Sequence, residues 1–179
     1  MDKKLYARLL SIIPLFRSLS PDELDQIVQI SKLLRVKKGV TVVEEGDEGA
    51  AMYILVEGKC EVVKRLPGGD NTRLAELAAP TVFGEMSLID QDKRSASVCT
   101  LTDVVLFQIN LHSFNKLRAG LSAAAFKVLR EIAPMLCSRV RQINDRIGDF
   151  FKNPEANLGT VEQQFLQRSL GSPKPAQGK

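Results

Sequence analysis

The sequence predicts a mainly β fold of the α+β class, a barrel or jelly roll flanked by helices. Two observations lead to this prediction. Short runs rich in β-branched residues follow one another from about residue 34 to residue 107, separated by turns rich in Gly, Asp, Asn and Pro. Helical periodicity precedes and follows this stretch. Many short strands at such spacing are typical of barrels and jelly rolls.

The N-terminal segment, residues 1–32, is predicted to form helices. An amphipathic pattern over residues 4–13 stops before Pro14. Next, Ser20-Pro21-Asp22-Glu23 has the spacing of a capping box with proline at the first helical position. The first residues have some features of a signal peptide, but Arg8 interrupts the apolar stretch and no small-residue cleavage site follows. We therefore expect a helix of the mature protein there.

Residues 33–110 are predicted to form the β-domain. The runs with strand character are VTVVE, MYILV, CEVVKRL, RLAEL, ASVCTL and VVLFQI. Between the third and fourth runs, the segment LPGGDN at residues 66–71 is the clearest hairpin loop.

Residues 111–151 are predicted to be helical, with interruptions near Gly120 and at Pro134. Proline removes a backbone donor and should kink the helix. Apolar side chains then recur at alternating spacings of four and three, which makes a heptad seam of about three repeats: Leu129, Ala133, Leu136, Val140, Ile143, Ile147 and Phe150. This seam either contacts a partner helix, most credibly from Met135 onward, or packs on the β-domain.

The last segment, residues 152–179, is predicted to be a polar tail. A capping box at Thr160–Gln163 precedes a short amphipathic stripe, so residues 161–170 could form one short helix. The tail is either an inert linker or a docking segment.

Composition restricts the classes of function. No apolar run approaches the ~20 residues that a membrane span needs. Three cysteines, far apart and odd in number, disfavour disulfides or a zinc site and fit a reducing cytoplasm. One histidine, His112, leaves metal-dependent hydrolases and histidine-based triads without their parts, so we do not expect an enzyme. The net charge of +4 only weakly indicates an anionic partner.

The most informative segment is FGEMSLIDQDKRSASV at residues 83–98. Gly84 allows close backbone approach, and the N–H groups of a short helical turn after it would attract an anion. Arg94 would supply a planar fork of donors for a phosphate. Glu85 would repel a phosphate unless its carboxylate accepts a hydroxyl, such as a ribose 2′-OH. These residues are consistent with a nucleotide site, and the alternative is a plain ion pair between neighbouring loops.

This segment and VVEEGDEGAAMYILVEG at residues 42–58 resemble the two signatures of the cyclic nucleotide-binding domain family. That family includes the bacterial catabolite activator protein and the regulatory subunit of cyclic-AMP-dependent protein kinase. The segment at residues 83–98 resembles the phosphate-binding cassette of the family. The likeness extends over about residues 15–147 and implies an eight-stranded jelly roll, also called a β-roll or double-stranded β-helix.

The resemblance implies a set of ligand-contacting residues. Arg94 would pair with the cyclic phosphate, and Glu85 would accept the ribose 2′-OH. The Gly84 turn and nearby backbone amides would complete the cradle, apolar side chains would form its walls, and a residue of the last helix would cap the base. The implied residues are Val62, Leu74, Phe83, Gly84, Glu85, Met86, Ser87, Arg94, Ser95, Ala96, Arg141 and Asn144, with Ile143 as a further candidate for the cap.

The function implied by the resemblance is that of a cytoplasmic receptor for a cyclic mononucleotide. A serine after the arginine, here Ser95, occurs in cyclic-AMP-binding bacterial activators, which favours cyclic AMP without deciding against cyclic GMP. The receptor would signal through its C-terminal helix to a second copy or to an effector protein. Only 31 residues follow residue 148, whereas a DNA-binding winged helix needs about 60–70, so direct DNA binding is not expected. The alternative is a dimerisation scaffold that keeps the fold but binds no ligand.

Overall fold

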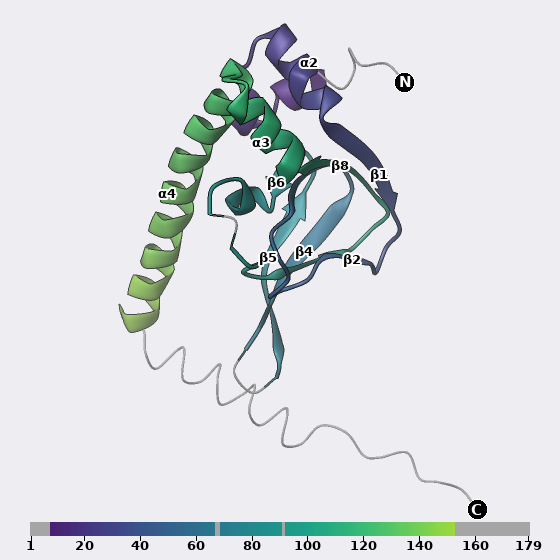
Figure 1. Ribbon diagram of the computed structural model, residues 1–179. Coiled ribbons are helices and arrows are strands. Elements are labelled where there is room, and N and C mark those ends of the chain that lie inside the picture. The colour runs from purple at the N-terminus through teal and green to yellow at the C-terminus, as the bar shows by residue number, and fades with distance from the viewer. Residues whose placement is uncertain (1–7, 67–68, 91, 153–179) are drawn as a thin grey trace, which may run out of the picture. The chain divides into compact units, whose positions relative to one another are not determined.

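The computed structural model describes residues 8–66, 69–90 and 92–152. Helices lie at both ends of the described chain and strands lie between them (Figure 1). The elements in chain order are η1 (Pro14–Phe16), α2 (Pro21–Gln29), β1 (Ser31–Val36), β2 (Thr41–Val43), β3 (Ala51–Glu57), β4 (Lys59–Arg65), β5 (Asn71–Ala78), β6 (Thr81–Phe83), η2 (Glu85–Leu88), β7 (Ser97–Thr100), β8 (Val104–Asn110), α3 (Leu111–Ala119) and α4 (Ala123–Lys152).

The strands of the described residues form two antiparallel four-stranded sheets. One sheet has the order β1-β8-β3-β6 and the other has the order β2-β7-β4-β5. The chain passes repeatedly from one sheet to the other, which is the pattern of a jelly roll. The predicted mainly β fold with flanking helices is therefore confirmed.

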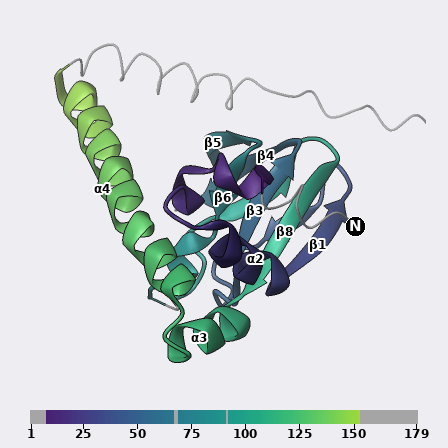
Figure 2. The same ribbon diagram turned by 90° about the horizontal axis from the view of Figure 1, so that it is seen from above.

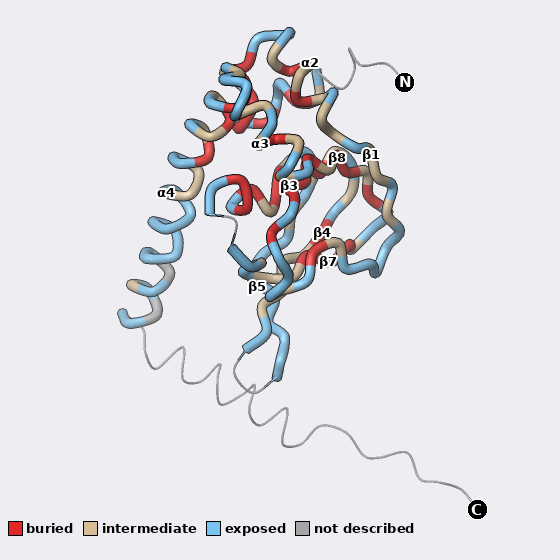
Figure 3. Tube along the Cα trace, in the orientation of Figure 1, coloured by how far each residue is buried: buried red, intermediate tan, exposed pale blue. Residues whose placement is uncertain are grey.

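The core of the β-roll lies between the two sheets. Alternate residues of each strand face it, because side chains along a strand point to opposite faces in turn. The buried members of this core are Val43, Ala51, Tyr53, Leu55, Cys60, Phe83, Val98, Val104 and Leu106. Most of the intervening side chains of β3 and β8 are also buried (Figure 3): Met52, Ile54, Phe107 and Ile109. On that outer side, helix α2 contacts β1 and α3 contacts β8 (Figure 2).

The hairpin predicted at residues 66–71 is confirmed. Strands β4 and β5 pair as far as Arg65 and Asn71, and the Leu66 N–H donates to the Asp70 carbonyl at 2.7 Å. Strand β5 lies at the edge of its sheet, and its residues 71–76 are exposed.

The predicted capping box starts helix α2. The Ser20 side chain accepts from the Glu23 N–H at 3.3 Å, and Glu23 Oε2 accepts from the Ser20 N–H at 2.7 Å. The same Glu23 oxygen accepts from Lys127 Nζ at 2.7 Å, and Ser122 Oγ donates to Gln26 Oε1 at 2.7 Å. These contacts join α2 to the first turns of α4. Residues 8–11 of the earlier predicted helix are helical, and its beginning lies outside the described residues.

Helix α4 differs from the prediction at one point. The predicted break near Gly120 separates α3 from α4, but α4 continues through Pro134 without interruption. A proline removes only one backbone hydrogen bond, and the long runs of helix on both sides retain theirs.

Residues 135–152 of α4 belong to a second unit, separate from residues 8–134. Within it, the predicted seam carries exposed apolar side chains: Val140 is 56%, Ile143 54% and Ile147 50% exposed. The side chain of Phe150 and the predicted short helix at residues 161–170 lie outside the described residues. No helix in the described part of the chain is long and apolar enough to cross a membrane.

Candidate functional site

A glycine turn and one helical turn follow strand β6, as predicted. Gly84 has a φ of +71° and begins η2, so the backbone lies in the left-handed region that favours glycine. A Cβ at this position would also lie 2.6 Å from Nη1 of Arg94. Glycine is therefore needed both for the turn and for the approach of the arginine.

The backbone of Arg94 is fixed by the loop that follows β2. The Arg94 N–H donates to the Asp47 carbonyl at 2.7 Å, and the Arg94 carbonyl accepts from the Gly46 N–H at 2.9 Å. Glu48 and Lys93 form an antiparallel bridge beside them. These bonds extend the β2–β7 pairing and place the arginine at the end of the roll.

The guanidinium group of Arg94 lies where β3, η2 and β7 come together. Nη2 donates to the Ala51 carbonyl at 2.5 Å, and Nη1 donates to Ser87 Oγ at 2.7 Å. A longer bond of 3.4 Å joins Nη1 to the Gly84 carbonyl. Ser87 is buried. All three acceptors are uncharged, so these bonds orient the guanidinium without neutralising it.

Burial shifts the pKa of the Arg94 guanidinium. It lowers this pKa from its ordinary value, while the nearby charges of Glu85 and Asp47 raise it. An arginine remains protonated at neutral pH, so the site carries a half-buried positive charge. Glu85 is only 2% exposed, which places a buried carboxyl group within electrostatic reach of it.

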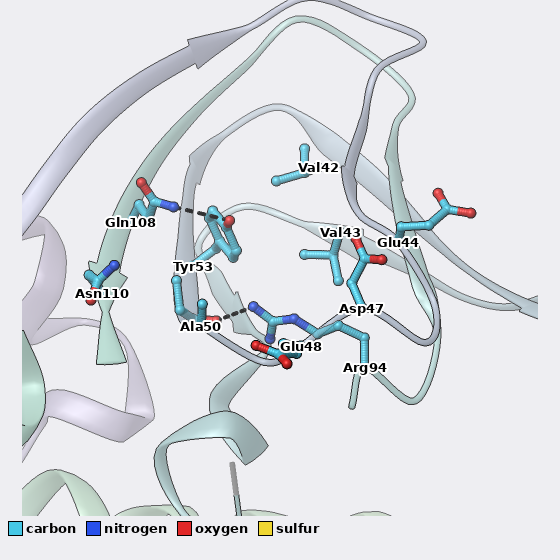
Figure 4. Close-up of a pocket in the computed structure, with 11 residues that line it drawn as sticks. Val42, Val43, Glu44, Asp47, Glu48, Ala50, Tyr53, Arg94, Gln108 and Asn110 are labelled. Carbon is cyan, nitrogen blue, oxygen red and sulfur yellow. Dashed lines mark hydrogen bonds between the residues drawn. The ribbon is translucent and has the colours of Figure 1, made fainter. Parts of the chain in front are cut away.

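A pocket of about 140 Å³ adjoins Arg94 on the side of β2, β3 and β8 (Figure 4). Its lining is Val42, Val43, Glu44, Asp47, Glu48, Ala50, Ala51, Tyr53, Arg94, Gln108 and Asn110. The Tyr53 hydroxyl accepts from Gln108 Nε2 at 3.2 Å, and the Tyr53 ring stacks on Phe83 with centroids 5.1 Å apart. The described residues contain no group of three His, Cys, Asp or Glu side chains able to hold a metal.

The structure brings part of the predicted site together. Hydrogen bonds join Gly84 and Ser87 to Arg94, and Phe83 directly precedes this cluster. Of the predicted residues, Arg94 alone is in the described lining of the pocket.

No described hydrogen bond joins Val62, Leu74 or Met86 to Arg94. Val62 packs half-buried against the roll core, whereas Leu74 is 50% and Met86 41% exposed. Arg141 and Asn144 are exposed residues of the part of α4 that belongs to the second unit.

Three contributors to the site were not predicted. The Ala51 carbonyl and the Tyr53 ring take part through backbone and packing geometry, for which the sequence carries no signal. Gly49 is different, because a Cβ there would lie 2.7 Å from the Asp92 carbonyl and in collision with Ser87 Oγ. Gly49, the second glycine of the segment GDEG at residues 46–49, therefore allows the β2–β3 loop to contact the segment around η2. The spacing of the two glycines in this segment could have indicated this role.

These features define a class of protein: a β-roll with an oriented, half-buried arginine at one end. The sequence model of the cyclic nucleotide-binding domain matches residues 33–120. The chain is 31% identical over 159 residues to the cyclic AMP receptor protein of Thermus thermophilus, covering 88% of this chain and 72% of that protein. The chain belongs to the cyclic nucleotide-binding domain family.

A solved structure and a further relative agree with this assignment. The crystal structure of the Thermus thermophilus catabolite activator protein has a TM-score of 0.67 and 30% identity, covering 75% of this chain and 62% of that one. Human cGMP-dependent protein kinase 2 is 32% identical over 113 residues, which are 62% of this chain and 15% of the kinase. The chain thus spans less than two thirds of the crystallised protein and a small part of the kinase.

Proposed function

We propose that this chain is a receptor for a cyclic mononucleotide and that Arg94 binds the cyclic phosphate. The observation that carries the proposal is the orientation of the half-buried guanidinium by three uncharged acceptors. A guanidinium has five N–H groups, so it can bind an anion in addition to the three acceptors described. A desolvated charge is costly unless a partner compensates it, and a phosphate would be such a partner.

The neighbouring groups fit the sugar and phosphate of the same ligand. Glu85 would accept the ribose 2′-OH from its buried position beside Arg94. Backbone amides around Ser87, Ser95 and Ala96 would complete the phosphate cradle. The exposed side chains of Leu74 and Met86, with Phe83 and Val62, would then contact apolar parts of the ligand and lose their exposure to water.

For the base, we propose cyclic AMP as the ligand, with cyclic GMP as the alternative. Ser95 is a residue found after the arginine in cyclic-AMP-binding bacterial activators. The relatives include both a cyclic AMP receptor protein and a cGMP-dependent kinase. Arg141 or Asn144 would cap the base, and an Asn amide can hydrogen-bond either purine.

For the response to the ligand, we propose that nucleotide binding changes the conformation of helix α4. The helix would pass this change, in the cytoplasm, to a second copy or an effector protein. Its residues from Val140 onward carry an exposed apolar stripe of the kind that a partner helix covers. A ligand shifts an equilibrium only by its different affinities for two conformations, so the surface of this helix should differ between the free and bound states.

The experiment is isothermal titration of the purified chain, stripped of bound nucleotide, with cyclic AMP and separately with cyclic GMP. We expect binding at micromolar concentration or below, and its loss in Arg94→Ala. The matched control is Arg35→Ala, because Arg35 is an exposed arginine of β1. If neither nucleotide binds, the ligand-independent scaffold is the better description. Turnover of the nucleotide during long incubation would instead indicate an enzyme.

A further inference from the structure

Lys64 of strand β4 contacts the segment that carries Arg94. Its Nζ donates to the Ser95 carbonyl at 2.8 Å and to Glu45 Oε1 at 2.7 Å. Lys64 lies two residues after Val62, so both side chains share one face of β4. Lys64 is therefore on the same face of β4 as Val62, which we propose to contact the ligand. It is not among the described residues that line the pocket beside Arg94.

The hydrogen bonds of this segment fix the direction of the following backbone amide. The Arg94 carbonyl faces the β2 side, where it accepts from the Gly46 N–H. Because the C=O and N–H of a trans peptide point in opposite directions, the Ser95 N–H faces away from β2. Strand β7 lies between β2 and β4, so this N–H is directed toward β4.

Residues 95 and 96 form a bend before β7 begins at Ser97. The ladder between β4 and β7 runs only from Cys60 to Val63 on the β4 side, so no strand pairing holds Ser95. The Lys64 ammonium donates to the Ser95 carbonyl the hydrogen bond that a backbone N–H of a paired strand would otherwise donate. It therefore holds the peptide that follows Ser95, while the Gly46 N–H holds the peptide that precedes it.

Glu45 holds the lysine in turn. Its Oε2 accepts from the Arg65 N–H at 2.9 Å, and its own N–H donates to Ser97 Oγ at 2.9 Å. The Arg65 N–H and Lys64 lower the pKa of Glu45, so the carboxylate stays charged at neutral pH. With the carboxylate 2.7 Å away, the lysine adds little net field to the anion site, and its effect acts mainly through geometry.

We propose that Lys64, anchored by Glu45, is a positioning residue that fixes the Ser95 peptide so that its N–H binds one exocyclic oxygen of the cyclic phosphate. This inference rests on the proposed function. It assigns a role to a β4 residue outside the two segments that resemble the family signatures.

The test compares Lys64→Met and Lys64→Arg with a matched control, Lys59→Met. Lys59 is another ion-paired lysine of β4, bonded to Glu76 at 2.9 Å, without contact to the Arg94 segment. We expect Lys64→Met to weaken cyclic AMP binding about tenfold, which corresponds to one charge-assisted hydrogen bond. Lys64→Arg should keep an affinity for cyclic AMP within about threefold of the wild type, and the affinity of Lys59→Met should stay within about twofold.

Two readouts separate positioning from a general effect of charge or stability. The wild type should discriminate between the two diastereomeric phosphorothioate analogues of cyclic AMP, because only one sulfur replaces the oxygen at the Ser95 N–H. Lys64→Met should reduce that discrimination, and its tenfold loss should persist at about 0.5 M NaCl, where exposed charges are screened.

Equal affinity of Lys64→Met and the wild type, an unchanged ratio of the two analogues, or recovery of binding in high salt would each overturn the proposal. These outcomes presuppose that the wild type binds. If the wild type binds neither cyclic AMP nor cyclic GMP, the proposed function itself fails, and the inference fails with it.

Discussion

Replacement of Arg94 by lysine tests whether geometry or charge makes the anion site. The guanidinium reaches the Ala51 carbonyl with one nitrogen and Ser87 Oγ with another, at 2.5 and 2.7 Å. A lysine keeps the positive charge but has a single nitrogen and cannot reproduce the fork. It should lose at least one charge-assisted hydrogen bond, worth about 1.5–3 kcal/mol. The affinity for the cyclic nucleotide should therefore fall about 10- to 150-fold.

The assay is isothermal titration of Arg94→Lys, accompanied by thermal unfolding of the ligand-free protein. Unfolding should occur at lower temperature than in the wild type, because an acceptor in the half-buried cluster loses its donor. Arg35→Lys, an exchange at an exposed position of β1, should change neither quantity appreciably. Binding by Arg94→Lys within about threefold of the wild type would refute the argument that the oriented fork is required.

Further predictions address the groups around this site and the two helical regions. Gly49→Ala should weaken binding at least tenfold, because its Cβ would collide with the segment around η2; titration would show an unchanged affinity if the approach were dispensable. Glu85→Ala should weaken a ribose nucleotide but hardly its 2′-deoxy analogue, and equal losses for both would contradict the ribose role. The double variant Val140→Glu, Ile147→Glu should be monomeric by light scattering if the exposed stripe joins two copies, and a monomeric wild type would contradict that interface. Hydrogen bonds from Lys127 and the Ser20 backbone lower the pKa of Glu23 from its ordinary value, so its stabilising contribution is present above the pKa of the unfolded state and is lost as the pH falls through the lower folded pKa. Glu23→Gln should accordingly unfold at lower temperature than the wild type at pH 7 and approach it under acid conditions; a constant difference would exclude the linkage.

Much of the fold follows from local patterns in the sequence. The capping box of α2 and the hairpin between β4 and β5 are determined by side chains a few residues apart. The turn after β6 needs Gly84, and the nearly continuous apolar runs of β3 and β8 agree with strands that are buried on both faces. The site segment 83–98 was recognisable because its glycine, carboxylate and arginine lie within twelve residues.

The remaining features depend on contacts between distant residues. Ala51 contributes a carbonyl to Arg94 across 43 positions in the chain, and its methyl group gives no sign of this. Lys64 reaches Ser95 across 31 positions, and in the sequence it is one charged residue of a strand among several. The continuity of α4 through Pro134 was mispredicted because the penalty for one proline is local, whereas the length of the surrounding helix determines the outcome.

The stacked pair of Tyr53 and Phe83 also gives the protein an intrinsic optical reporter. The chain has no tryptophan and two tyrosines, Tyr6 and Tyr53. Tyr6 lies outside the described residues, whereas Tyr53 lines the pocket beside Arg94 and is 8% exposed. In a Tyr6→Phe variant, all tyrosine emission would come from the pocket wall. Occupation of the site could then be followed by the intrinsic fluorescence of the protein, whose intensity would report the surroundings of one phenol ring.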